Sequence, residues 1–253
     1  MNPSDKNITL RTCTSEDEHS IARLLHENFP NSPAPESILE TWRWQFKNSF
    51  SKDSQVAVAD VDGAIIAHYA VMWFCMNCQG KTIDGAISTA TVTDRRFRGK
   101  GLFTKLARKV YDDTAKDGCK LVFGFPNSQS VKGFITKLDW FEICPFPVHI
   151  KPINLTPFLT RSLGRNVLTT FLGKSSTVLL KAILETFNPK RIDVHADIRP
   201  ITDIPEELND VWQQSFASGK IAVVRDKRYL EWRYLRKPFF KYRIFHVVAD
   251  GDT

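Results

Sequence analysis

The 253-residue sequence lacks any segment that predicts export or a membrane span. Residues 1–7 have no basic and then apolar pattern, so a signal peptide is not expected. The most apolar stretch, Ala64 to Met76, is interrupted by His68 and is too short to cross a bilayer. These absences favour a cytoplasmic protein.

Cysteine is also scarce, and its arrangement argues against a disulfide framework. The five cysteines are odd in number and irregularly spaced, which indicates free thiols. Cys75 and Cys78 have the spacing of half a zinc site, but no second pair follows them. Because Cys75 also lies in an apolar, strand-like run, we interpret both as packing residues and expect no metal.

Basic residues exceed acidic ones, 35 against 28, and the formal net charge of +7 favours anionic ligands. A long nucleic-acid duplex would call for a basic stripe over several elements, and the local distribution of charge favours a compact polyphosphate over it. Aromatic residues fall at apolar helix and strand positions, so core packing is preferred to base stacking and no nucleic-acid partner is expected. Five basic residues instead surround two glycines, which suits a compact polyphosphate: Arg95, Arg96, Arg98, Lys100 and Lys105.

Hydrophobic periodicity over residues 8–150 predicts an α/β fold with a mixed sheet. The hairpin around Asp62-Gly63 is antiparallel, whereas the segment from residue 86 onward forms a βαβ unit with a right-handed crossover. The expected elements, in order, are a strand at 8–11, helices opening at Ser15 and Pro35, strands at 55–60, 64–76 and 86–93, a helix from Leu102 to about Asp117 with Gly118 as its C′ residue, a strand at 121–125, a helix at 130–138 and strands within 140–150.

Residues 154–187 change to helical periods rich in leucine, phenylalanine, threonine and basic residues. We expect an amphipathic helix pair there and interpret it as a connector packed on the core. The predicted organisation is a first domain at 1–150, the connector at 151–195 and a second module at 196–253. Membrane-surface contact is the less favoured alternative for the helix pair, through Arg161, Arg165, Lys174 and Lys181.

The last segment contains a weak internal repeat. Trp42-Arg43-Trp44 recurs as Trp232-Arg233-Tyr234, and the strand Val56 to Asp60 recurs as Val247 to Asp250, with a spacing near 190 residues. Residues 196–253 therefore read as the start of a second β-α-α-β module. It is either the beginning of a truncated tandem copy or an accessory layer on the first domain. We favour truncation, because a terminal strand leaves an edge with unpaired backbone groups.

The strongest functional signal is the turn Arg96-Phe97-Arg98-Gly99-Lys100-Gly101. Gly99 and Gly101 lack a Cβ, so the backbone can turn sharply and bring its N–H groups close to an anion. The helix that opens at Leu102 directs its positive dipole end to the same place. The turn does not fit Gly-x-x-x-x-Gly-Lys-Ser/Thr, and no Gly-x-Gly-x-x-Gly follows the first strand, which disfavours triphosphate and dinucleotide sites.

The segment Thr91 to Leu102 resembles the Arg/Gln-x-x-Gly-x-Gly/Ala signature of the GNAT superfamily of N-acetyltransferases. Val122 to Ser128 and Phe134 to Trp140 are similar to that superfamily's fifth strand, Asn-containing loop and fourth-helix end. The resemblance covers residues 8 to about 150. It looks most like bacterial members with a Phe-Gly-Phe-Pro-Asn form, some of them tandem and linked to polysaccharide or amino-sugar modification.

The resemblance implies a GNAT fold that binds acetyl-CoA as co-substrate. Its pantetheine arm would pair with the backbone of the strand that ends at Thr93 and pass the loop after the fifth strand. Its pyrophosphate would lie on the turn that opens the third helix. The implied cofactor-binding residues are Thr91, Val92, Thr93, Arg96, Arg98, Gly99, Lys100, Gly101, Leu102, Asn127 and Ser130.

Acyl transfer to an amine needs a neutral amine, a polarised thioester carbonyl and a proton for the leaving thiolate. A backbone N–H of Val92 or Thr93 is the expected oxyanion donor. The tyrosine that often serves as acid in the family is replaced, since the positions that could align with it are Phe134 and Ile135. Candidate substitutes are His68, Tyr69, Ser88 and Thr89, although His68 reads equally as a sheet histidine and Tyr69 as a core residue.

We therefore expect an N-acetyltransferase that acts on a primary amine of a small molecule, with an amino sugar as one acceptor class. Two alternatives stay open. The first is a non-catalytic CoA-binding or partner-binding domain of a tandem protein, because the usual acid is missing. The second is an aminoacyl-tRNA-dependent transferase, which the intact glycine turn disfavours. The sequence leaves the oligomeric state open, a homodimer included.

Overall fold

The computed structural model describes residues 7–29, 31–147, 154–164, 166–186, 196–216 and 221–249. The chain divides into two compact units. One contains Met1–Phe141 together with Pro200–Phe245, and the other contains Glu142–Arg199 together with His246–Thr253. The predicted division at residues 150 and 195 stays a prediction.

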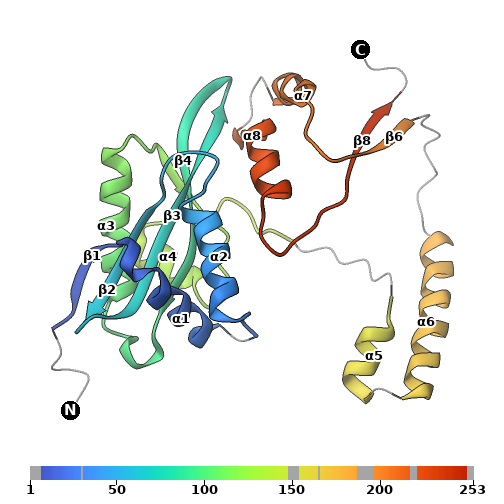
Figure 1. The fold of residues 1–253 in the computed structure, drawn as a ribbon, viewed down its shortest axis with the longest axis horizontal. Coiled ribbons are helices and arrows are strands. Elements are labelled where there is room, and N and C mark those ends of the chain that lie inside the picture. Colours follow the sequence, from blue (N-terminus) through green and yellow to red (C-terminus); the bar gives the residue numbers. More distant parts are fainter. Residues whose placement is uncertain are drawn as a thin grey trace. The chain divides into compact units, whose positions relative to one another are not determined.

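The first unit is built on a six-stranded mixed sheet, as the sequence predicts (Figure 1). The pairs β1–β2, β2–β3 and β3–β4 are antiparallel, and the pair β4–β5 is parallel. A short strand from the C-terminal part, β7 (Ile221–Val223), pairs with the end of β3. The other strands, in sheet order, are β1 (Thr9–Thr12), β2 (Gln55–Val61), β3 (Ala64–Cys78), β4 (Lys81–Thr93) and β5 (Leu121–Phe123).

Helices cover both faces of this sheet (Figure 1). Side chains of α1 (Glu18–Asn28) and α2 (Pro35–Phe46) form one buried cluster with one face, which we call the α1–α2 face. Side chains of α3 (Leu102–Lys116) and α4 (Val131–Leu138) form a second cluster with the other, the α3–α4 face. From Tyr69 to Met72, successive residues of β3 alternate between the two clusters, as an extended strand requires.

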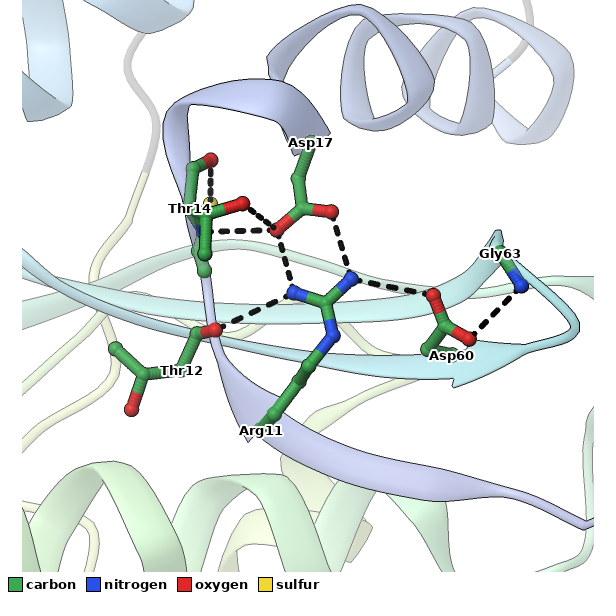
Figure 2. Close-up of polar contacts among 7 residues, drawn as sticks. Arg11, Thr12, Thr14, Asp17, Asp60 and Gly63 are labelled. Atoms are coloured by element: carbon green, nitrogen blue, oxygen red, sulfur yellow. Dashed lines mark hydrogen bonds and ion pairs between the residues drawn. The ribbon is translucent and has the colours of Figure 1, made fainter.

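The start of the first helical segment is held by an ion-pair cluster (Figure 2). Arg11 on β1 donates to both carboxylate oxygens of Asp17, at 2.6 and 2.8 Å, and to Asp60 at 3.1 Å. Asp17 also accepts from the backbone N–H of Thr14, whose side chain completes a capping box. The predicted cap at Ser15 is therefore wrong by one residue: a short 3-10 turn, η2 (Ser15–Asp17), precedes α1.

The predicted strands within 140–150 are also wrong for residues 140–147, which have no strand pairing. Pro145 and Pro147 lack backbone N–H donors and so oppose a ladder in this segment. Residues 148–150 lie outside the described part of the chain. The other elements predicted over residues 8–138 are present with shifted ends in two strands: β4 begins at Lys81 rather than at residue 86, and β5 ends at Phe123 rather than at residue 125. Gly118 has φ of 94° after α3, as predicted.

The predicted helix pair is present as α5 (Thr156–Leu163) and α6 (Val167–Thr186). No helix in the described ranges is long and apolar enough to cross a membrane. The C-terminal elements are β6 (Ala196–Ile201), α7 (Glu207–Phe216), β7, α8 (Lys227–Leu230), the π-helical turn η4 (Glu231–Leu235) and β8 (Ile244–Ala249), and β6 pairs with β8.

Candidate functional site

A cavity of about 580 Å³ opens along β4 on the first unit. Its walls come from β4 residues 88–93, the turn and first residues of α3 at 97–99 and 101–104, the loop after β5 at 124–127 and 129–130, three residues of α4, and Phe29 after α1. The β4–β5 ladder ends at the pair Ile87 and Phe123, whereas β4 continues to Thr93. The cavity therefore occupies the space where β5 no longer covers the edge of β4.

A bulge shapes this part of β4. The register against β3 shifts between His68 and Ala70, and Ala90 has a positive φ of 53°. A left-handed backbone costs an alanine about 1–2 kcal/mol, so surrounding contacts must hold it. One of them is the hydrogen bond that His68 Nδ1 donates to the Ala90 carbonyl at 2.8 Å.

The ladder beyond the bulge determines which backbone groups face the cavity. The N–H of Asp94 donates to the carbonyl of Ile66 at 2.9 Å. Because antiparallel ladders alternate, the N–H and carbonyl of the neighbouring Thr93 turn away from β3 and toward the cavity side. Consistent with this direction, Arg98 Nε donates to the Thr93 carbonyl at 3.2 Å.

The glycine turn follows β4 and forms part of the cavity wall. Gly99 has φ of 80° and Gly101 has φ of 74°, and Gly101 immediately precedes α3. An added Cβ would meet no heavy atom within 4 Å at either position, so the space beside both backbones is open. The first N–H groups of α3 therefore point at an accessible, positively polarised site.

The cationic residues of the turn differ in placement. Arg98 lines the cavity, whereas Arg96 pairs with Asp94 at 2.6 Å and is absent from the lining. The Arg96 guanidinium lowers the pKa of the Asp94 carboxyl. Lys100 Nζ lies 5.5 Å from the centre of the Phe97 ring and is also absent from the lining.

Asn127 and Ser130 form the far wall beside α4. Asn127 Oδ1 accepts from the backbone N–H of Ser130 at 3.0 Å and from its hydroxyl at 3.0 Å. Both residues line the cavity. The loop after β5 is therefore fixed by its own hydrogen bonds and presents polar groups opposite β4.

His68 and Tyr69 lie on opposite faces of the sheet. His68 is fully buried beside α2, where its Nε2 accepts from Trp42 Nε1 at 3.1 Å, and burial lowers its pKa to about 4. Tyr69 is fully buried on the α3–α4 face, and burial raises its pKa. Neither side chain lines the cavity.

Two close neighbours in the cavity wall were missed by sequence reasoning. Phe103, at the start of α3, lies beside Gly133 of α4, where an added Cβ would stand 3.3 Å from the ring. The available signal was a glycine within a predicted helix, which often marks a close approach. Of the two positions considered for the missing tyrosine, Phe134 is buried and lines the cavity, whereas Ile135 is 42% exposed and does not line it.

A mixed sheet whose fourth and fifth strands separate beside a glycine turn defines an acyl-CoA N-acyltransferase fold. In agreement, the family model of the acetyltransferase (GNAT) domain matches residues 9–141, more than half of the chain. The chain belongs to the GNAT acetyltransferase family. No curated protein sequence gives a significant match to it.

Several solved structures of GNAT acetyltransferases are similar in fold. Glucosamine-6-phosphate N-acetyltransferase from Arabidopsis thaliana is 18% identical, with a TM-score of 0.46, and the match covers 58% of this chain and 100% of that one. A predicted acetyltransferase with acetyl-CoA from Clostridium acetobutylicum is 13% identical, with a TM-score of 0.48 and coverages of 57% and 96%. An aminoglycoside N-acetyltransferase in complex with CoA is 13% identical, with a TM-score of 0.45 and coverages of 60% and 99%.

Proposed function

We propose that this protein transfers an acetyl group from acetyl-CoA to the primary amine of a small molecule, by direct attack in a ternary complex. The observation that carries the proposal is the continuous cavity from the Gly99–Gly101 turn to the open edge of β4. Thr91 Oγ1 in this wall is buried and has no hydrogen-bond partner among the described residues. Such an orphaned polar group fits a site that a polar ligand completes.

In the proposed complex, the pyrophosphate lies on the first N–H groups of α3, beside the Arg98 guanidinium. The pantetheine arm runs along β4 between residues 91–93 and the Asn127 loop. Cavity-side backbone N–H groups of β4, with Thr93 the best placed of those predicted, bind the arm or the developing oxyanion. Arg96 and Lys100 do not line the cavity and contribute only positive charge near the turn.

We propose an amino sugar as the acceptor class. The support is the Phe-Gly-Phe-Pro-Asn sequence of residues 123–127, which resembles GNAT members linked to amino-sugar modification. Our proposed catalytic groups leave out His68, because both of its ring nitrogens are hydrogen-bonded within the α1–α2 face. A non-catalytic CoA-binding domain is the second candidate. It is favoured by one observation, namely that neither Phe134 nor Ile135 supplies the proton donor that is usual in the family.

Binding and turnover test the proposal. We expect calorimetry to detect acetyl-CoA, and Gly101→Val to weaken its binding by at least about tenfold, because the new side chain fills the space beside the α3 N-terminus. Gly63→Val is the matched control: Gly63 has φ of 82° and equally open surroundings, but it lies in the β2–β3 turn. Equal affinities in the two variants would contradict the proposed cradle.

Release of CoA thiol with a panel of amines then separates the two candidates. An acetyltransferase releases thiol in proportion to amine, whereas a CoA-binding domain binds acetyl-CoA and releases none. We also propose that residues 196–253 form a partial second GNAT-like module, on the internal repeat. Trp232 of this segment stacks on Trp44 in the first unit, with ring centres 4.4 Å apart, which favours the accessory-layer alternative over truncation.

A further inference from the structure

The cavity extends to both sides of the sheet. Most of its wall away from β4 lies on the α3–α4 side, at the start of α3 and along α4. Phe29, the residue that follows α1, is also part of the wall. Because α1 packs on the α1–α2 face, the cavity continues past the open edge of β4 toward that side of the sheet.

Two neighbouring residues of β4 turn to opposite sides at this edge. Ser88 Oγ donates to the Tyr69 hydroxyl at 2.8 Å, so the Ser88 side chain turns to the α3–α4 face. Thr89 turns to the other side, where Gln45 Nε2 of α2 donates to its Oγ1 at 3.4 Å. Both residues line the cavity. The wall therefore includes side chains from both sides of β4.

Phe125, in the loop after β5, lies on the α1–α2 side of the sheet. An added Cβ at Gly124 would stand 3.2 Å from the Trp140 ring, which packs against the α3–α4 cluster. The residues before and after Gly124 therefore turn the other way. Phe123 packs against the α1–α2 cluster, and its ring centre is 6.4 Å from that of Phe125. Phe125 thus joins Phe29 on this side of the cavity.

These two phenylalanines are exposed although they line a cavity. Phe29 is 46% exposed and Phe125 is 70% exposed, and neither belongs to either buried cluster of the described residues. Exposed aromatic side chains in a concave site often contact a ligand. Thr89 and Gln45 supply a hydroxyl and an amide on the same side. This part of the wall thus combines flat apolar surfaces with neutral hydrogen-bonding groups.

We infer that Phe29 and Phe125 determine acceptor specificity and favour a cyclic amine, such as an amino sugar in its ring form, over an open-chain amine. The inference rests on the proposed acetyltransferase function. With acetyl-CoA bound through the α3 N-terminus on the α3–α4 side, the α1–α2 side of the gap is left for the acceptor. A sugar ring has an apolar C–H face that packs on an aromatic ring, and polar edges that suit Thr89 and Gln45. A rigid ring also loses less conformational freedom on binding than a chain does.

Steady-state kinetics with a cyclic and an open-chain amine test the inference. Thiol release is measured with glucosamine and with glucamine, an open-chain amino alcohol of the same carbon number. We expect Phe29→Ala to raise KM for glucosamine about 3- to 10-fold, because an aromatic contact is lost, and to change KM for glucamine and for acetyl-CoA by less than about twofold. Phe125→Ala should act in the same direction, and Phe29→Tyr, which keeps a ring, should retain the lower KM. Comparing each variant with the unsubstituted protein cancels the different basicities of the two amines.

Phe240→Ala is the matched control. Phe240 is 56% exposed and does not line the cavity, so its loss should change KM for neither amine. Equal values of KM for glucosamine in Phe29→Ala and Phe240→Ala would overturn the inference. An equal rise of KM for both amines in Phe29→Ala would also overturn it, because the ring would then not be what Phe29 selects.

Two further outcomes separate the inference from the proposed function. Thiol release with glucamine but not with glucosamine would overturn the inference and leave the function standing. If acetyl-CoA binds and no amine releases thiol, the proposed function fails. Saturation-transfer NMR of glucosamine on the CoA-loaded protein then decides the inference. Transfer to the ring C–H protons that Phe29→Ala abolishes would support it, and any other result would overturn it.

Discussion

The two faces of the sheet are built from the same strands but differ in polarity and access. The α1–α2 face is closed and aromatic, and its core includes Trp232 from far along the chain. The α3–α4 face contains the Tyr69 and Tyr111 hydroxyls, which lie 2.6 Å apart, and it borders the cavity. Neighbouring residues of β3 show the contrast, since His68 belongs to the closed face and Tyr69 to the other.

This difference indicates that the two faces have different roles. The closed face fixes the backbone, because His68 anchors the Ala90 carbonyl at the β4 bulge from one side of the sheet. The α3–α4 side uses the resulting exposed strand edge for ligand contacts. Changes on the closed face should therefore alter stability, and changes on the other side should alter binding and turnover. The predictions below test the closed face in order of decreasing effect.

Loss of Trp232 should have the largest effect. Trp232 is buried, stacks on Trp44 at an interplanar angle of 8°, and exchanges hydrogen bonds of 3.1 and 3.2 Å with it. We expect Trp232→Ala to lower the free energy of unfolding by about 3–5 kcal/mol, because the truncation leaves a cavity in the core. Urea denaturation measures this loss, and Trp232→Phe should retain most of the stability. An unchanged midpoint for Trp232→Ala would show that residues 200–245 do not share this core.

The next prediction concerns pH and His68. The pKa of His68 is about 4 in the folded protein, below its ordinary value of 6.5. The unfolded chain therefore binds a proton first as pH falls, and stability is lost between pH 6.5 and 4, by about 3 kcal/mol in total. His68→Gln should flatten this part of the profile of unfolding free energy against pH. Parallel profiles for the two proteins would refute a neutral, buried His68.

The Arg11 cluster should give a smaller effect at lower pH. The hydrogen bonds from Arg11 lower the pKa of Asp17 to about 2, from an ordinary value of 3.8. Its stabilisation of about 2 kcal/mol is present above pH 4 and is lost as pH falls toward 2. We expect Asp17→Asn to remove it at neutral pH in urea denaturation. Asp113→Asn is the control, since its pair with Lys109 is a helix-surface contact worth about 0.5 kcal/mol or less.

The smallest predicted effect is a gain in stability. Ala90→Gly should relieve the left-handed backbone and stabilise the fold by about 0.5 kcal/mol, after the added entropy of the unfolded glycine is subtracted. Ala86→Gly, at a fully buried and regular position of β4, should instead destabilise it. Thermal unfolding compares the two variants. Destabilisation by both would mean that the bulge carries no strain.

The sequence predicts the fold well where the pattern is local. The hairpin around Gly63, the helix after Gly101 and the C′ residue Gly118 all follow from periodicity and turn chemistry, and the structure confirms them. The strands predicted within 140–150 fail over residues 140–147, where Pro145 and Pro147 supply no backbone N–H for a ladder. The cap of the first helix fails by one residue, because Thr14 and Ser15 are chemically alike as caps.

For the candidate site, the sequence gives residues but not their directions. Asn127, Ser130 and Arg98 do line the cavity, whereas Arg96, Lys100, His68 and Tyr69 do not. Which way Arg96 turns depends on Asp94, and the face to which His68 points depends on the register of β3. Neither the β4 bulge nor the contact between Tyr69 and Tyr111, 42 residues apart, has a sequence signal.

The sequence by itself determined the anion-binding turn: two glycines precede a helix after an apolar strand, glycine adopts a left-handed backbone without strain, and helix N-termini attract anions. It also determined the mixed sheet through the spacing of its hairpin and βαβ unit. Only the tertiary structure decided which groups meet at the cavity. That outcome depends on strand register and on packing between distant segments, such as Trp44 against Trp232, which local preferences do not encode.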